Sequence, residues 1–212
     1  MHHLHTVFIV SSSLTVTTII NNCMLKYDYT DEWRLIAKLS IDFPFAQQEV
    51  YTALEKEQYY GDEDRTYCPN PSSHILKEIL DIVKTNIPNL LLDMTNHPEF
   101  KHKWCLEYPE QLVNNTKTSC MFVCDKPGYN IDTHVDSRMQ VCTGMLFFNH
   151  DDDPNQSTTF YTSHSGDNPL LMTSQYGTGW YAANTHDCWH SGANNTQRNR
   201  YSIIFINKLD LK

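Results

Sequence analysis

Residues 139–149 read MQVCTGMLFFN, an apolar run that is typical of a buried strand and characterises the second half of the chain. Other short apolar runs surround it, separated by turn signals rich in Gly, Pro, Asn and Asp. Many short strands at regular spacing indicate a sandwich or a jelly-roll barrel. The other strand candidates are residues 119–124, 158–163, 179–183 and 201–207.

The first half of the chain, from about residue 31 to residue 110, has a helical pattern. Helices followed by strands predict an α+β protein in which the helices brace one side of a jelly-roll, or double-stranded β-helix, core. The expected segments are a helix capped by Asp31 that includes residues 33–39, a helix over 46–58, a loop over 59–72, a helix from Ser72 or Ser73 to near Pro88, and a helical stretch over 89–94.

One domain accounts for most of the 212 residues. We expect a single domain over residues 24–212, with helical support over about 31–110 and the jelly roll over about 117–208. Residues 1–23 form an extension of uncertain status. Their apolar stretch is short for a membrane span and has no basic residue ahead of it, and Met24 opens an ordinary cytosolic start, so we expect residues 1–23 to be dispensable.

The net charge and the cysteine pattern limit the expected binding partners and the expected cellular compartment. The chain has 16 Lys and Arg against 25 Asp and Glu, a net charge of −9, which disfavours nucleic acid as a partner. Its seven cysteines include no C-x-x-C motif, and this favours reduced thiols packed as small apolar side chains in a cytoplasmic protein. No membrane partner is expected, and the oligomeric state stays open.

The candidate chemistry lies in the strand half, at residues 134–136, which read HVD. In an extended chain His134 and Asp136 project from the same face, so an imidazole and a carboxylate would lie together. A histidine from the later segment 185–192, either His186 or His190, would complete a triad of two histidines and one carboxylate. That ligand set is typical of non-haem Fe(II) oxygenases, because it leaves coordination positions open.

Residues 200–202, which read RYS, open the last apolar strand. By the same two-residue period Arg200 and Ser202 share a face, and together they form a good bidentate cradle for a carboxylate ligand. A second H-x-D motif at residues 150–152 lies in an acidic turn before Pro154. We therefore interpret it as a solvated loop rather than a metal site.

The order and spacing of these motifs over residues 118–207 resemble the Fe(II)- and 2-oxoglutarate-dependent dioxygenases, which use a double-stranded β-helix. Their pattern is H-x-D, a distal His, and an Arg about ten residues later, often as R-x-S. The spacing to Arg200 and the context WHSG favour His190 over His186 as the distal ligand. No resemblance is found in the helical N-terminal part.

The resemblance implies that His134, Asp136 and His190 bind Fe(II), while Arg200 and Ser202 bind the C5 carboxylate of 2-oxoglutarate. The C1 carboxylate and the keto oxygen would chelate the iron. The implied reaction consumes O2, hydroxylates a C–H bond of a small molecule, amino acid or peptide, and releases succinate and CO2. The retained carboxylate of Asp136 favours hydroxylation over halogenation.

Three further residues are secondary candidates, which would contact the substrate or support the metal ligands: Arg138, His186 and Trp180. The alternative to an enzyme is a non-catalytic jelly-roll or cupin-like binding module. The position of Arg200, ten residues after a candidate ligand, distinguishes the two, because such a module has no need of it.

Overall fold

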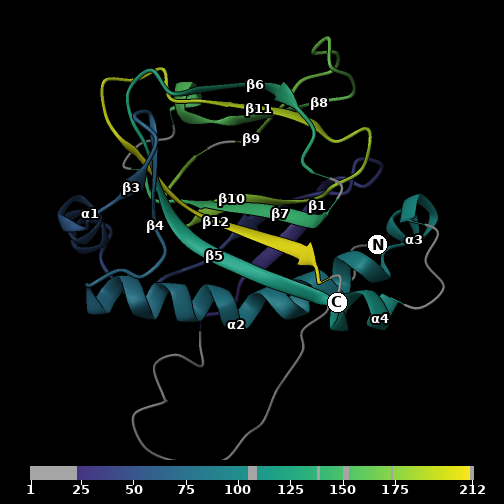
Figure 1. Ribbon diagram of the computed structural model, residues 1–212, viewed down its shortest axis with the longest axis horizontal. Helices are drawn as coiled ribbons and strands as arrows, with labels where there is room; N and C mark the ends of the chain where they lie inside the picture. The colour runs from purple at the N-terminus through teal and green to yellow at the C-terminus, as the bar shows by residue number, and fades with distance from the viewer. Residues whose placement is uncertain (1–22, 105–108, 138, 150–152, 173, 211–212) are drawn as a thin grey trace, which may run out of the picture.

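The computed structural model describes residues 23–104, 109–137, 139–149, 153–172 and 174–210. A four-stranded sheet lies above an eight-stranded sheet, and the long helix runs beneath the larger sheet (Figure 1). The paired strands of both sheets are antiparallel. The predicted α+β class, a jelly roll braced by helices, is confirmed.

The larger sheet supplies one wall of the barrel and the smaller sheet the other. The strands of the larger sheet, in spatial order, are β1 (Lys26–Asp31), β2 (Ile36–Ser40), β10 (Thr178–Ala183), β7 (Gln140–Phe147), β12 (Arg200–Leu209), β5 (Thr116–Asp125), β4 (Arg65–Cys68) and β3 (Tyr60–Gly61). Those of the smaller sheet are β6 (Asn130–His134), β11 (Trp189–Ala193), β8 (Thr158–Tyr161) and β9 (Leu170–Met172).

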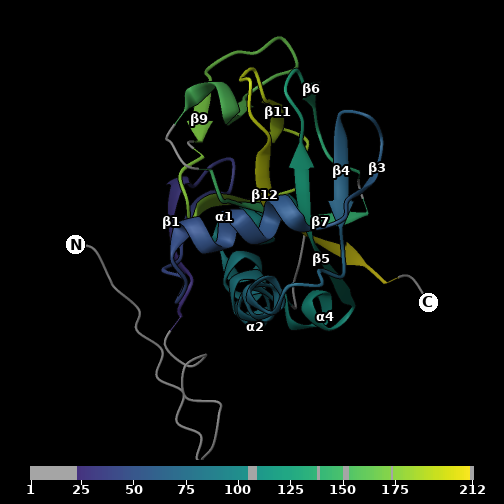
Figure 2. The same ribbon diagram turned by 90° about the vertical axis from the view of Figure 1, so that its left-hand side faces the viewer.

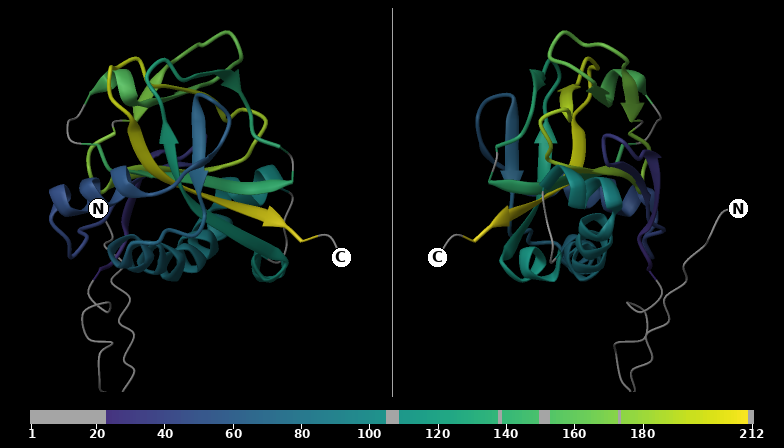
Figure 3. Two further views of the ribbon diagram at one scale, coloured as in Figure 1. Left: turned by 60° about the vertical axis from the view of Figure 1, so that its left-hand side comes forward. Right: turned by 90° about the vertical axis from the view of Figure 1, so that its right-hand side faces the viewer.

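Helices lie beneath the larger sheet and beside its ends, as the three orientations show (Figures 1, 2 and 3). They are α1 (Gln47–Lys56), α2 (His74–Asn96), α3 (Pro98–Trp104) and α4 (Pro109–Asn114), and a short 3-10 helix spans Pro154–Gln156. Within the described ranges no helix is long and apolar enough to cross a membrane.

Strand alternation divides the buried side chains into two cores. On β10, Tyr181 packs toward the helices, whereas its neighbour Trp180 packs between the two sheets. The core between the sheets also contains Met145, Phe147 and Phe160. The barrel interior is therefore a separate compartment from the helix-covered core.

The close pairing of β7 and β10 depends on Gly179. A Cβ atom built at this position would lie 1.9 Å from the carbonyl oxygen of Met145, which is a backbone atom of the neighbouring strand. Only glycine therefore allows these two strands to approach as they do.

The predicted helix over 33–39 is wrong, because this segment forms the turn and second strand of the β1–β2 hairpin. Asp31 accepts a hydrogen bond from the backbone N–H of Arg34 at 2.8 Å, the contact expected of a helix cap. Here it closes a turn instead, since Asp side chains make the same local bond in both settings. The strand then buries Ile36, Ala37 and Leu39 between β1 and β10.

The predicted end of a helix near Pro88 is also wrong, because α2 continues through it to Asn96. Pro88 faces solvent, while Ile87, Leu90, Leu91 and Met94 remain on the buried face. That buried apolar surface offsets the hydrogen bond lost at the proline. The expected helix over 89–94 is the second half of α2.

Other segments refine the sequence interpretation. The helix expected over 46–58 is confirmed as α1, and all five strand candidates of the second half are present as β5, β7, β8, β10 and β12. The expected loop over 59–72 contains the hairpin β3–β4, and the strands β6, β9 and β11 were not predicted. The six cysteines that the structure describes are all free. The extension over residues 1–22 lies outside the described residues.

Candidate functional site

Two histidines and one carboxylate converge inside the barrel. His134 ends β6, His190 lies on β11, and the two are paired directly across the strands. Asp136 follows β6 by two residues, so it leaves the sheet and turns back toward the histidines. The Oδ1 atom of Asp136 lies 3.9 Å from Nε2 of His134 and 4.0 Å from Nε2 of His190.

The ligand atoms of these three residues all lie within 4.8 Å of one another. Among the described His, Cys, Asp and Glu side chains, no other group of three or more is arranged to hold a metal ion. Two imidazoles and a carboxylate suit a transition metal such as Fe(II), and three ligands leave coordination positions open.

Each histidine is oriented by a backbone carbonyl two residues before it. Nδ1 of His134 lies 2.8 Å from the carbonyl oxygen of Asp132, and Nδ1 of His190 lies 3.3 Å from that of Cys188. A carbonyl oxygen can only accept, so Nδ1 carries the hydrogen in each ring. The lone pair is thus left on Nε2, which faces the centre of the triad.

Burial also prepares His190 for metal binding. Desolvation lowers the pKa of His190, although the nearby carboxylate of Asp136 acts in the opposite direction. Below neutral pH an ordinary histidine gains a proton and can no longer bind a metal through that nitrogen. A lowered pKa therefore extends the pH range in which His190 is a ligand.

The third ligand, Asp136, is held from below by β7. The hydroxyl of Thr143 donates to Oδ2 of Asp136 at 2.6 Å, which leaves Oδ1 facing the two histidines. Thr143 was not predicted as a site residue. No local motif marks it, because only the packing of β7 against the turn after β6 brings the two together.

Two polar atoms in the barrel interior have no hydrogen-bond partner among the described residues: Ser202 Oγ and Trp180 Nε1. Ser202 is fully buried and Trp180 is 3% exposed. The indole of Trp180 packs beside Phe160, at 5.0 Å between ring centroids, and beside His190, at 6.0 Å. Such unsatisfied buried groups are costly, and they mark a place where a polar ligand fits.

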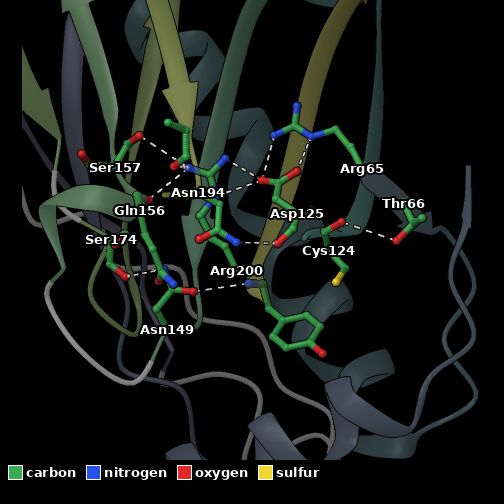
Figure 4. A network of polar contacts seen from close by, with 12 residues as sticks. Arg65, Thr66, Cys124, Asp125, Asn149, Gln156, Ser157, Ser174, Asn194 and Arg200 are labelled. Atoms are coloured by element: carbon green, nitrogen blue, oxygen red, sulfur yellow. Dashed lines mark hydrogen bonds and ion pairs between the residues drawn. The ribbon is translucent and has the colours of Figure 1, made fainter. Parts of the chain in front are cut away.

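Arg200 faces the interior from β12, and its guanidinium is already hydrogen-bonded to other groups of the protein. Nε donates to Oδ2 of Asp125 at 2.9 Å and Nη2 donates to the same oxygen (Figure 4). Nη1 donates to the carbonyl oxygens of Gln156 and Ala193, each at 3.0 Å. A ligand carboxylate held through two hydrogen bonds by Arg200 alone does not fit this arrangement, because Asp125 already takes one side of the guanidinium.

A guanidinium has five N–H groups, and one on Nη2 is left after these contacts. Nη2 lies beside Gly192, where an added Cβ atom would be 3.7 Å from it. Gly192 is two residues beyond His190 on β11, on the same face of the strand. The remaining N–H therefore lies next to a small space on the wall that carries the metal ligand.

Asp125 also pairs with a second arginine, Arg65 on β4. Burial works against the charge of Arg65, but the hydrogen bonds and charge of Asp125 outweigh it and raise the pKa of Arg65. Burial lowers the pKa of Arg200, with Asp125 acting against that change. Both guanidiniums stay protonated at ordinary pH. Neither Asp125 nor Arg65 was predicted as a site residue. Asp125 directly follows an apolar run, which is the one sequence signal that could have marked it.

The secondary candidates Trp180, His186 and Arg138 lie in different parts of the chain. Trp180 lies in the barrel interior, whereas His186 is exposed in the loop between β10 and β11 and is not part of the ligand group. Arg138 and the second H-x-D motif at residues 150–152 lie outside the described residues.

The architecture matches solved 2-oxoglutarate and Fe(II) oxygenases. One is a prolyl hydroxylase from Trichoplax adhaerens in complex with a hypoxia inducible factor peptide (TM-score 0.57, 10% identity, 84% of each chain covered). A second is a viral collagen prolyl hydroxylase of Paramecium Bursaria Chlorella virus-1 with 2-oxoglutarate (TM-score 0.51, 13% identity, covering 82% of this chain and 96% of that one).

A third is an oxidoreductase of the 2OG-Fe(II) oxygenase family from Burkholderia pseudomallei (TM-score 0.52, 10% identity, covering 76% of this chain and 77% of that one). No protein-family model and no curated protein sequence matches the chain. At these identities the similarity is one of fold, and the fold is that of 2-oxoglutarate and Fe(II) oxygenases.

Proposed function

We propose that this protein is an Fe(II)- and 2-oxoglutarate-dependent dioxygenase that hydroxylates a C–H bond and releases succinate and CO2. The observation that carries the proposal is the triad of His134, Asp136 and His190, with ligand atoms within 4.8 Å of one another inside a barrel of this fold. The resemblance of the sequence motifs and the likeness of fold point to the same family.

The donor set fits Fe(II). His134 and His190 would bind it through Nε2 and Asp136 through Oδ1, while Thr143 keeps the carboxylate turned toward the histidines. Three ligands leave room for a keto acid that chelates through its C1 carboxylate and keto oxygen, and for O2. In this family, iron and 2-oxoglutarate together activate O2 for insertion of an oxygen atom into the substrate.

The interior also fits the far end of a five-carbon dicarboxylic acid. The unpartnered hydroxyl of Ser202 and the remaining Nη2 hydrogen of Arg200 are donors for its C5 carboxylate. From His190 to Gly192 the strand advances roughly 7 Å, which is comparable to the length of such an acid. Arg200 would thus contribute one hydrogen bond and a positive charge to binding.

The remaining interior side chains would shape the space for the substrate. Phe160, Trp180 and Met145 are buried between the sheets and exclude water from the metal side of the barrel. The indole N–H of Trp180 has no partner within the described part of the chain, and we assign it to an acceptor on the substrate or the cosubstrate. His186 is exposed and Arg138 lies outside the described residues, so their contact with substrate stays a prediction.

The substrate class that we propose is a small molecule or an amino-acid or peptide side chain. One of the structures of this fold is a prolyl hydroxylase with a bound peptide, which supports the peptide alternative. The net charge of −9 argues against nucleic acid. The six described free thiols, five of them buried, suit a reducing compartment, and we propose the cytoplasm.

The test is anaerobic addition of Fe(II) and then 2-oxoglutarate to the full chain, with the visible charge-transfer absorption of the iron–keto acid complex as the readout. We expect the band in the wild type and its loss in Asp136→Ala. In air, we expect succinate, with a 16-dalton gain on the true substrate. Neither a band nor succinate would instead favour a non-catalytic binding module, and full activity of Asp136→Ala would refute the triad.

A further inference from the structure

We propose that Arg65, acting through Asp125, makes the acid-binding end of the barrel selective for a keto acid with a second carboxylate. The inference rests on the proposed function and adds two residues to it. Arg65 is a positioning residue here, because it acts on the acid through Asp125 and Arg200 and need not touch the acid itself.

The three side chains form one cluster, in which Asp125 and Arg200 are buried and Arg65 is 17% exposed (Figure 4). Asp125 is fully buried and accepts two hydrogen bonds from Arg65, Nε to Oδ1 and Nη2 to Oδ2, the second at 2.9 Å. Arg200 donates to Oδ2 through Nε and Nη2. One carboxylate therefore holds two guanidiniums, from β4 on one side and from β12 on the other.

The charge of this cluster does not balance. Two guanidiniums carry two positive charges and Asp125 carries one negative charge, so one positive charge remains. Within the described residues, Asp125 is the one carboxylate that forms an ion pair with either arginine. The side chains of Arg200 and Asp125 are 1% and 0% exposed, and a buried charge without a partner is costly. An anionic ligand would supply that partner.

Arg65 decides whether this surplus exists. Without it, Asp125 and Arg200 would form a neutral pair, and an incoming carboxylate would meet Asp125 as a repelling charge. With it, Asp125 is neutralised from the β4 side and the charge of Arg200 remains available. The Arg65 guanidinium also packs on the Tyr129 ring, 4.2 Å from its centroid, and this contact fixes it behind Asp125.

The surplus charge is presented at a defined place. The free Nη2 hydrogen of Arg200 adjoins the space beside Gly192, and Ser202 lies on the same face of β12 as Arg200. The triad, by contrast, would bind the keto-acid end of any 2-keto acid. The cluster should therefore strengthen the binding of 2-oxoglutarate, which has a distal carboxylate. It should not change the binding of pyruvate, which has none.

The experiment measures the dissociation constants of 2-oxoglutarate and pyruvate for anaerobic Fe(II)-loaded protein, from the charge-transfer band rather than from turnover. The variants are Arg65→Met, Arg65→Lys, and Arg65→Met combined with Asp125→Asn. The matched control is Arg34→Met, which removes another buried arginine paired with an aspartate, Asp31, outside the cluster. Circular dichroism and thermal melting verify that each variant is folded.

We expect Arg65→Met to weaken 2-oxoglutarate binding about ten-fold or more while pyruvate binding changes little. Arg65→Lys, which keeps the charge, should lose less. The double variant should recover most of the lost affinity, since it has the same net charge as the wild type and frees the guanidinium of Arg200. Arg34→Met should bind both acids nearly as the wild type does.

Three outcomes would overturn the inference: unchanged 2-oxoglutarate binding in Arg65→Met, equal weakening of both acids, or a folded double variant that does not recover. If Arg65→Met fails to fold, Arg65→Lys and the double variant still decide the question. A wild type that binds Fe(II) but forms no band with either acid would contradict the proposed function itself, and this result is distinguishable from the other three.

Discussion

Single hydrogen bonds determine how the three metal-binding residues present their ligand atoms. Carbonyl oxygens turn both histidines so that Nε2 faces inward, and one hydroxyl turns Asp136. These contacts cost little to form, because each uses a group that would otherwise need a partner. They reduce the side-chain freedom that metal binding would otherwise have to remove.

The hydroxyl of Thr143 gives a direct test of this orientation. Thr143→Val keeps the shape of the side chain but removes the 2.6 Å hydrogen bond to Asp136. We expect the Fe(II) affinity to fall about 10- to 100-fold, as measured by anaerobic titration. Thr143→Ser keeps the hydroxyl and should stay close to the wild type. Equal affinities for the valine and serine variants would contradict this role.

Replacing Ser202 by alanine should have opposite effects on the stability of the fold and on 2-oxoglutarate binding. Its buried hydroxyl has no partner within the described ranges, so Ser202→Ala should keep or raise the free energy of unfolding, by up to about 1 kcal/mol. The same change should weaken 2-oxoglutarate binding, since a donor for the C5 carboxylate is lost. The thermal midpoint and the charge-transfer titration measure the two effects.

The control is Ser174→Ala. The hydroxyl of Ser174 is also buried, but it donates to the carbonyl oxygen of Asp153 at 3.4 Å. Its removal should lower stability and leave acid binding unchanged. A large loss of stability in Ser202→Ala would mean that its hydroxyl has a partner in solution.

At the scale of elements, Glu57 connects the end of α1 to the start of α2. Its carboxylate accepts hydrogen bonds from the backbone N–H groups of Ser72 and Ser73, at 2.8 and 2.6 Å, and from the Ser72 hydroxyl at 3.0 Å. Partial burial acts against ionisation, but these bonds outweigh it and lower the pKa of Glu57 below its usual 4.5. The carboxylate thus caps a helix that lies across a long loop.

Glu57→Gln should lower the free energy of unfolding at pH 7 by about 1 kcal/mol or less, a small shift in the thermal midpoint. Because the folded pKa is below the unfolded value, the contribution is fully present above about pH 4.5 and is lost as the pH falls through the folded pKa. The difference between variant and wild type should therefore shrink in acid. Glu55→Gln, an exposed change on the same helix, should leave stability unaltered at both pH values.

At the scale of the whole molecule, the larger sheet separates two functions. Its lower face packs on α2 and contains most of the buried apolar side chains, while its upper face and the smaller sheet enclose the candidate site. The side chains of neighbouring residues on β10 and β12 alternate between the two compartments. A change on the helix side should thus alter stability without altering the chemistry.

Leu91→Ala tests this separation. Leu91 is 3% exposed in the core under the sheet, and its truncation should cost about 2–5 kcal/mol and lower the thermal midpoint by about 5–15 °C. Leu92→Ala, at the neighbouring position that is 38% exposed, should have little effect. Below the transition, Fe(II) affinity should match the wild type in both variants. A large loss of affinity in folded Leu91→Ala would show that the two compartments are coupled.

The sequence alone was sufficient for the parts that depend on short-range patterns. Apolar runs indicated five strands, and the resemblance of the ordered motifs H-x-D, distal His and R-x-S to one family indicated the expected ligands. The local sequence pattern was insufficient where the same signal is compatible with two kinds of secondary structure. Asp31 makes its cap-like bond in a hairpin turn, and Pro88 is tolerated because α2 buries leucines on both sides of it.

Only the tertiary structure decided which side chains from distant segments share the barrel interior. Arg65, Asp125 and Arg200 meet because β4, β5 and β12 are neighbours in one sheet. Thr143 reaches Asp136 because β7 packs against the turn after β6. The spacing of residues along the sequence does not show which strands become neighbours in the sheet. The charge that a ligand would meet is a sum over all of them, so it could be determined only after the chain had folded.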